Sequence, residues 1–554
     1  MTSPCGYLSA SAPGKVLLCG GYLVTEAPNL GLSVGVDARF HTRLQIDDDE
    51  SSSGNDQQGD KVRDDIVIYS PQFGSVFAYR VAWSTSEARD PSPKPAVSVS
   101  QTQGPASPFL HHAVLACAAW KADAIMWTHN ASVTDAQHLP KLVSRPLRLT
   151  LLADNDFYSQ RAYLERLGLP VTPANLRQVP PHQPLEGKIS KTGLGSSAAL
   201  TMSLVACLAT ALCRDASLRG TADVSQNVLH RIAQIAHCVA QGKIGSGFDV
   251  FTACYGTCVY RRFPSSLIER VMNVVTAATA AAATGNGGET IRVEVGPFAA
   301  VVRDQGGWAA AERATASHGG STETSEGPRD RMPRGLHVML ADIYAGGSST
   351  PGMTAKITEW KKRTAAASSD GKAPLWQTIA GLNERFIATL AHLRSAAKEY
   401  PTEYDGVIAT LADVPSRDWV ASAACSPLQR GIFEHFFSLR DISASLRRKM
   451  RQMGEEAAVE VEPASVTPLL DGTIDGAPGV ACVGCPGAGG YDAVYALVVS
   501  SSPTGPSIAR VEDFWVRYAA LQVCPLLVRE GGAGLQFNHD AAADRAADSS
   551  KRTR

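Results

Sequence analysis

A chain of 554 residues is long enough for two to four domains, and 44% hydrophobic with 19% charged residues is ordinary for a globular enzyme. The formal net charge of −1 gives no electrostatic footprint for nucleic acid or for an anionic membrane, so we expect neither as a partner. No charged N-terminal region precedes an apolar run, and we expect no apolar stretch of membrane-spanning length. The expected location is the cytoplasm.

The twelve cysteines are scattered through apolar segments, which predicts reduced core residues. Cys482 and Cys485 form the single C-x-x-C pair, and no second pair completes a zinc site. We therefore expect no metal or redox role for them.

Residues 7–12 predict a first strand that runs into a turn at Pro13, Gly14 and Lys15. An apolar run, residues 16–18, follows at once, and a charge beside it is costly unless it has a partner. We therefore expect Lys15 to have a partner, and a solvated loop lysine is the alternative.

Acidic and Ser/Gly/Gln-rich residues 47–64 predict a disordered surface excursion. Residues 66–69 and 76–79 predict two strands that pair around the turn at 71–74. The alternating segment 147–152 then predicts a half-buried strand that ends at an acidic turn.

A glycine-rich segment around Gly193 and Gly195 precedes a nearly all-apolar helical pattern that starts at Ser196. Because glycine has no Cβ, the backbone can turn tightly and bring its N–H groups close to a ligand. The N-terminus of the helix adds unpaired N–H groups and the positive end of its dipole. The segment therefore predicts a phosphate-binding loop.

Three alternatives exist for this loop. It could be only a Gly-Ser turn that caps a buried helix. Gly193, Gly195 and Ala198 also satisfy the dinucleotide pattern G-x-G-x-x-A, but residues 188–192 are mostly polar where that pattern requires a buried strand. The P-loop pattern G-x-x-x-x-G-K-[ST] does not occur in the chain.

Apolar residues at helical spacing predict an amphipathic helix over 228–242, followed by a loop with Lys243, Ser246 and Asp249. Asp249 follows glycines and precedes an apolar run, so its carboxylate is a candidate general base beside a lysine. A helix-capping aspartate is the alternative.

Composition suggests the domain boundaries. Low-complexity Ala, Thr and Gly residues, and then Ser, Glu and Arg residues, fill much of 266–335, which we interpret as an elaborated, partly disordered linker. It separates an N-terminal domain, residues 1–265, from a C-terminal domain, residues 336–538. Residues 539–554 predict a disordered tail.

The second domain opens with a strand at 336–340, a Gly/Ser loop at 346–350 and a helix from Met353. Long helical patterns follow, and a Gly-rich turn at 486–492 precedes a strand at 493–499.

Three of these segments are similar, in order, to the motifs of the GHMP small-molecule kinases: Ser11–Leu23, Gly193–Ala199 and Pro486–Asp492. Three more resemble segments of the phosphomevalonate kinases of fungi and plants: Leu152–Gln160, Gln241–Asp249 and Ala345–Gly352. The resemblance implies an α+β, two-domain GHMP kinase fold, with an N-terminal nucleotide-binding domain, a C-terminal α/β domain and low-complexity insertions.

The resemblance also implies an activity, the ATP-dependent phosphorylation of (R)-5-phosphomevalonate to (R)-5-diphosphomevalonate in the mevalonate route to isoprenoids and sterols. It implies that Lys15 and Asp249 are catalytic and that a Ser197 hydroxyl meets Mg²⁺. The implied ATP-binding residues are Gly193, Leu194, Gly195, Ser196, Ser197 and Ala198. The implied substrate-binding residues are Tyr22, Lys243, Ser246, Ser348, Ser349 and Thr350.

One feature departs from the resemblance. Many GHMP kinases place a metal-binding glutamate about eleven residues before the catalytic aspartate, where this chain has His237, Cys238 and Gln241 nearby. Alternative functions are mevalonate kinase, diphosphomevalonate decarboxylase, or a catalytically silent sensor, although the presence of Lys15 and Asp249 argues against the sensor. The expected oligomeric state is a monomer or a homodimer.

Overall fold

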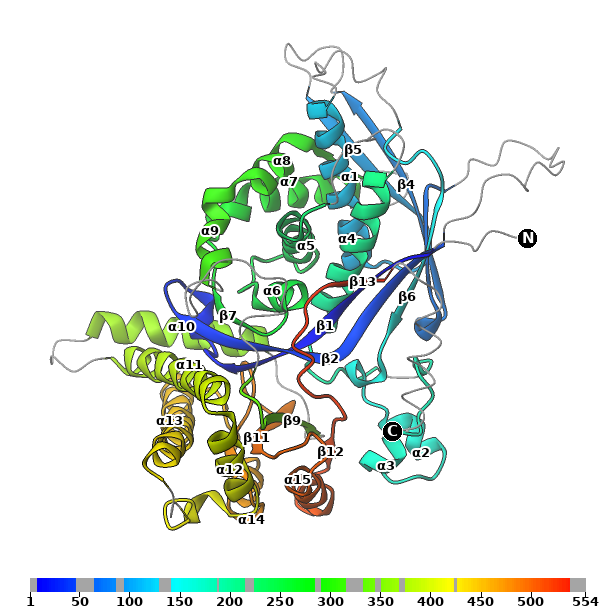
Figure 1. Ribbon diagram of the computed structural model, residues 1–554. Helices are drawn as coiled ribbons and strands as arrows, with labels where there is room; N and C mark the ends of the chain where they lie inside the picture. The colour runs from blue at the N-terminus through cyan, green and yellow to red at the C-terminus, as the bar shows by residue number, and fades with distance from the viewer. Residues whose placement is uncertain are drawn as a thin grey trace.

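The computed structural model describes eleven segments of the chain, drawn as ribbon in Figure 1. They are residues 7–45, 64–85, 94–128, 141–186, 189–214, 224–283, 290–314, 332–343, 350–367, 374–422 and 426–538. The expected disordered tail, residues 539–554, lies outside them.

A large mixed sheet forms the framework of the first domain. Within the described residues it has nine strands in the order β13-β1-β2-β6-β3-β4-β5-β8, with β7 paired to β2. Neighbouring strands are antiparallel except β3 and β6, which are parallel. The strands are β1 (Tyr7–Cys19), β2 (Leu30–Gln45), β3 (Ile66–Ser70), β4 (Ser75–Thr85), β5 (Pro95–Gln103), β6 (Leu147–Ala153), β7 (Cys258–Arg261), β8 (Thr290–Glu294) and β13 (Gln536–Asn538).

Helices cover one face of this sheet (Figure 1). In β2, Phe40, Thr42 and Leu44 are buried while the residues between them are partly exposed, so one face of the strand is apolar and packs under the helices. The helices are α1 (Pro108–Thr128), α4 (Ser196–Arg214), α5 (Gln226–Ala240), α6 (Phe248–Tyr255), α7 (Ser266–Ala283), α8 (Val295–Arg303) and α9 (Gln305–Ala314). Two short helices, α2 (Arg161–Arg166) and α3 (Pro173–Leu176), follow β6.

Helix α4 is the central helix of this layer and corrects one expectation from the sequence. Among the described residues it is the one helix long and apolar enough to cross a membrane, with a mean hydropathy of 1.8. However, 78% of that apolar window is buried inside the protein. The apolar composition therefore reflects contact with the sheet and with neighbouring helices.

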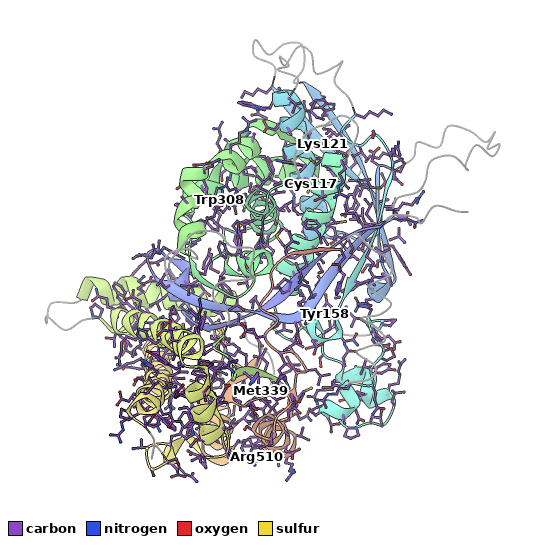
Figure 2. The ribbon with its side chains drawn as sticks, in the orientation of Figure 1. Cys117, Lys121, Tyr158, Trp308, Met339 and Arg510 are labelled. Carbon is purple, nitrogen blue, oxygen red and sulfur yellow. The ribbon has the colours of Figure 1, made fainter. Side chains whose placement is uncertain are left out.

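The structure also corrects part of the expected linker at 266–335, of which residues 315–331 lie outside the described residues. Residues 266–314, apart from the undescribed 284–289, form α7, β8, α8 and α9 and pack as part of the first domain. Strand β8 pairs with β5 at the edge of the large sheet. Trp308 of α9 is fully buried (Figure 2), and Glu312 forms an ion pair of 3.0 Å with the buried Arg231 of α5. These contacts could not be predicted from the low-complexity composition of the segment.

His230 of α5 lies in an aromatic environment within this helical layer. Its ring centroid is 5.1 Å from Phe251, 5.3 Å from Tyr255 and 5.5 Å from Trp308. Neither ring nitrogen has a hydrogen-bond partner among the described residues. Burial, and secondarily the charge of Arg231, lowers the pKa of His230 to about 3.

This environment makes the first domain sensitive to acid. The unfolded chain binds a proton on His230 near pH 6.5 whereas the native protein does not, so stability falls as the pH falls from 6.5 toward 3. The loss is up to about 1.4 kcal/mol per pH unit for this group. We expect His230→Phe to flatten the decline of the unfolding temperature between pH 7 and pH 5, and equal pH slopes in both proteins would contradict this.

The second domain is built on a smaller antiparallel sheet of the order β10-β11-β9-β12. Met339, Ala341 and Val494 face one core with α14 and α15, while Leu340 and Tyr495 face the other core with α11 to α13. The strands are β9 (Leu336–Ile343), β10 (Val480–Gly484), β11 (Ala493–Val499) and β12 (Val523–Pro525). The helices are α10 (Thr350–Ala367), α11 (Leu375–Glu399), α12 (Pro401–Ala412), α13 (Pro427–Ala457), α14 (Thr467–Gly476) and α15 (Pro506–Arg517).

The C-terminal segment returns to the first domain. The N–H of Asp37 donates to the carbonyl of Arg529, and Gly531 donates to Gly35. Strand β13 then pairs with β1 along Ser9–Ser11. The last residues of the second domain predicted at 336–538 therefore belong to the large sheet of the first domain. The chain passes between the two domains more than once.

Candidate active site

Lys15 lies on β1 at a bulge and contacts the glycine-rich loop. The register with β2 shifts between Pro13 and Lys15, and such a bulge bends the strand locally. The Lys15 N–H donates to the carbonyl of Leu194 at 2.8 Å, and the Lys15 Nζ donates to the carbonyl of Gly193 at 2.9 Å. The strand and the loop are thus joined by both the main chain and the side chain of one residue.

The loop conformation depends on its two glycines. Gly193 and Gly195 have φ of +78° and +75°, a region that side chains other than glycine rarely occupy. A Cβ on Gly195 would lie 2.8 Å from Cε of Lys15, whereas a Cβ on Gly193 would meet nothing within 4 Å. Gly195 therefore allows the lysine side chain to lie directly against the loop.

This contrast gives a matched pair of variants. Gly195→Ala and Gly193→Ala both carry the backbone cost of a positive φ, roughly 1–2 kcal/mol, but only the first also displaces Lys15. We expect turnover to fall at least about 10-fold further in Gly195→Ala, a difference of about 1.4 kcal/mol in barrier. Steady-state kinetics measure this difference in turnover, and equal losses in the two variants would show that Gly195 does not act through Lys15.

The segment before α2 is hydrogen-bonded to the residues that precede the glycine-rich loop. Thr192 Oγ1 donates to the carbonyl of Asp156 at 2.5 Å, and the Ser159 N–H donates to the carbonyl of Ser190. The Tyr158 hydroxyl hydrogen-bonds with Ser196, the first residue of α4, and burial raises the pKa of Tyr158 to about 12. In the view of Figure 2, Tyr158 lies near the lower end of the large sheet, beyond the end of β6.

Asp249 lies in the first turn of α6, which begins after Gly247 with φ of +88°. A Cβ on Gly247 would lie 2.6 Å from Phe263, so the turn into the helix requires glycine. The ring centroid of Phe248 is 5.5 Å from the Lys15 Nζ. Burial lowers the pKa of Lys15, and the nearby Asp249 carboxylate partly opposes this shift. Lysine and aspartate thus share one electrostatic environment.

Ser197 is linked to Asp249 through a residue of α5. The Ser197 Oγ is 3.1 Å from Nε2 of His237, and the Asp249 Oδ2 is 3.8 Å from the same nitrogen. His237 is buried, and burial lowers its pKa; the Asp249 carboxylate opposes this shift, whereas the Lys243 charge adds to it. The structure therefore brings together the predicted ATP, metal and catalytic residues.

Tyr22 joins the first and third glycine-rich segments. Its hydroxyl donates to the carbonyl of Ala488 at 2.6 Å, and the Gly487 N–H donates to the carbonyl of Leu17 at 3.0 Å. Tyr22 has φ of 62°, an uncommon value for a residue with a side chain, which this hydrogen bond helps to hold. The hydroxyl is engaged with the main chain, and the contact of Tyr22 with substrate stays a prediction.

The other predicted substrate residues fall into two groups. Lys243 is exposed and close enough to affect the pKa of His237, and the half-buried Ser246 follows it on the same loop. Ser348 and Ser349 lie outside the described residues. Thr350 is the first residue of α10, and its side chain is also outside the described part of the chain.

Comparison with known proteins agrees with this arrangement. Residues 161–257, which contain the loop and Asp249, match the family of GHMP kinases N terminal domains. The chain is 32% identical to the peroxisomal phosphomevalonate kinase of Arabidopsis thaliana, over 95% of each chain. It is 30% identical to a phosphomevalonate kinase of Aspergillus fumigatus, over 89% of this chain and 88% of that one. The chain belongs to the phosphomevalonate kinase family.

The solved structures support the same fold. A Lin0012 protein from Listeria innocua covers 96% of this chain with all of its own length, at a TM-score of 0.52 and 14% identity. This likeness concerns the fold alone. The match to the GHMP kinase family model and the identity to phosphomevalonate kinases confirm the α+β GHMP kinase fold inferred from the three glycine-rich segments.

Sequence reasoning did not anticipate three contributors to the site. Tyr158 supports the start of α4, Phe248 lies beside Lys15, and the His237 ring lies between Ser197 and Asp249. Each falls within or next to a segment that carries the resemblance. His237 was noted only as one of the residues near the missing glutamate, because nothing local in the sequence shows that its ring faces the loop.

Proposed function

We propose that the chain transfers the γ-phosphoryl group of ATP to the phosphate of (R)-5-phosphomevalonate and forms ADP and (R)-5-diphosphomevalonate. The observation that carries this proposal is 32% identity to a phosphomevalonate kinase along 95% of both chains. The reaction is a step of the mevalonate route to isoprenoids and sterols.

The loop suits the phosphates of ATP. The N–H groups of Ser196 and Ser197, in the first turn of α4, have no partner within the helix, whereas those of Ala198 and Ala199 donate to the carbonyl of Gly195. The helix dipole places positive potential at the same end. The Lys15 ammonium adds a full charge beside the loop. We propose that residues 193–198 hold the β- and γ-phosphates and that Lys15 neutralises the charge that develops during transfer.

The oxygen atoms near His237 suit Mg²⁺. This ion is usually bound by one or two carboxylates together with nucleotide phosphates and water. Ser197 and Asp249 offer a hydroxyl and a carboxylate, and the described residues contain no cluster of three His, Cys, Asp or Glu that could hold a metal by itself. We propose that these two residues hold Mg²⁺ together with ATP, where the ion would neutralise phosphate charge.

Asp249 would act on the accepting phosphate. A phosphate monoester is already largely ionised near neutral pH, since its second pKa is about 6. The carboxylate would therefore accept the remaining proton when one is present and otherwise orient the attacking oxygen. Lys243, Ser246 and the loop of Ser348, Ser349 and Thr350 would bind the substrate phosphate.

The test compares three substrates with the purified protein and Mg·ATP. Release of ADP from 5-phosphomevalonate, without inorganic phosphate or CO₂, is the expected result. Preference for mevalonate would indicate mevalonate kinase, and phosphate with CO₂ from 5-diphosphomevalonate would indicate the decarboxylase. ATP binding without turnover of any of the three would indicate a sensor.

The described cysteines are all free, which fits a reducing compartment. We propose a cytoplasmic location, although the Arabidopsis relative is described as peroxisomal. Imaging of a fluorescent fusion beside a peroxisomal marker distinguishes the two locations.

We also propose that the protein is a monomer or a homodimer, and light scattering decides between these two states.

A further inference from the structure

His237 occupies the centre of the contacts between α4, α5 and α6. Its Nε2 is 3.1 Å from the Ser197 Oγ, 3.3 Å from the Gln241 Nε2 and 3.8 Å from the Asp249 Oδ2. The side chain is only 3% exposed, and its ring centroid is 5.5 Å from that of Phe109. The imidazole is thus held in one orientation by packing on one side and by polar groups on the other.

The hydrogen-bond chemistry assigns a direction to these contacts. With the Gln241 amide oriented as it is in the structure, its nitrogen donates to Nε2, which makes that ring nitrogen an acceptor. Nε2 has a single lone pair, which the nearer Ser197 hydroxyl, at 3.1 Å, then shares as a donor with the Gln241 amide, at 3.3 Å. A serine that donates its proton to His237 keeps its oxygen lone pairs free, and they would be available to a cation bound with ATP.

We propose that His237 is a positioning residue for phosphoryl transfer, which orients the Ser197 hydroxyl and holds it at a fixed place relative to Asp249. This inference rests on the proposed function of the site. It gives the chain a way to arrange a cation site without the glutamate that many GHMP kinases carry on this helix. His237 acts through Ser197 and does not itself bind the phosphates or the ion.

The first experiment compares three variants of buried histidines. His237→Phe keeps a ring against Phe109 and removes both nitrogens, whereas His237→Gln places an amide near the position of Nε2. His230→Phe is the matched control, because His230 is also buried and lies about two turns earlier in α5 among aromatic side chains. We expect kcat to fall about 10²-fold in His237→Phe and less in His237→Gln, and to stay within about 3-fold in His230→Phe.

The second experiment tests whether His237 acts through Ser197. In a double-mutant cycle, His237→Phe combined with Ser197→Ala should be no slower than Ser197→Ala alone, within about 2-fold. Paramagnetic resonance of Mn²⁺·ADP gives a reading that does not depend on turnover. Both single variants should weaken binding of Mn²⁺·ADP by a similar factor and leave metal-free ADP unchanged.

Several results would overturn the proposal. One is His237→Phe with the kcat and Mn²⁺·ADP affinity of the wild type. Another is a pair of effects that multiply in the double variant, which would mean that His237 acts independently, as a direct ligand or by packing. If His237→Phe does not fold by circular dichroism, the same cycle is run with His237→Gln. A wild type that is inactive on 5-phosphomevalonate would refute the proposed function, while the Mn²⁺·ADP comparison would still decide the role of His237.

Discussion

Lys15→Met should lower kcat by about 10²-fold or more and change the binding of ATP much less. Methionine is about as long as the lysine stem, so the contact with Gly195 is kept while the charge next to Gly193 is lost. The cation stabilises charge that is greatest in the transition state, and its loss therefore appears mainly in kcat. Rapid-quench measurement of ADP formation separates this effect from product release.

Lys243→Met is the matched control for this variant. Lys243 is exposed and is proposed to contact the substrate phosphate, so its loss should raise the KM for 5-phosphomevalonate more than it lowers kcat. If Lys15→Met turned over at close to the wild-type rate, the catalytic assignment of Lys15 would be wrong and the sensor would regain support.

Asp249→Asn should also lower kcat by about 10²-fold or more, with little change in the unfolding temperature. The competing explanation is a carboxylate in the first turn of α6 that only stabilises the helix, which is worth about 0.3–1 kcal/mol. That explanation predicts a lower unfolding temperature and nearly normal kcat. Measuring both quantities on the same protein decides between them.

Asp154→Asn provides the control for a structural aspartate. Its Oδ2 accepts a hydrogen bond from the Arg39 N–H at 2.9 Å, in an acidic turn that ends β6. We expect this variant to lose stability and to retain kcat, the reverse of Asp249→Asn. If both variants changed kcat and stability in the same way, the assignment of a catalytic role to Asp249 and a structural role to Asp154 would be contradicted.

Local patterns in the sequence were sufficient for the glycine-rich loop, for α4 and for the strands β3 and β4. Gly193, Gly195 and the apolar run after Ser196 predict a turn and a buried helix, because these preferences depend on residues close together in the chain. Lys15 and Asp249 were named as candidates on the resemblance, and their catalytic roles stay predictions.

The features that were missed depend on contacts between distant residues. Trp308 and Glu312 anchor a segment whose composition is typical of a linker, and their partners lie in α5. The pairing of β13 with β1 joins the two ends of the described chain, which no local pattern predicts. The role proposed for His237 depends on its contacts with Ser197, which is 40 residues earlier in the chain, and with Asp249 of α6, which follows it.

The central claim is that the accepting group is the phosphate of 5-phosphomevalonate, and tracing the transferred phosphorus tests it most directly. The protein is incubated with ATP labelled at the γ-phosphate, Mg²⁺ and 5-phosphomevalonate, and the products are separated and analysed by mass spectrometry and ³¹P NMR. We predict that the label appears in the terminal phosphate of 5-diphosphomevalonate, with one ADP formed per product. Label recovered only in ATP or in inorganic phosphate, with 5-phosphomevalonate unchanged, would contradict the account.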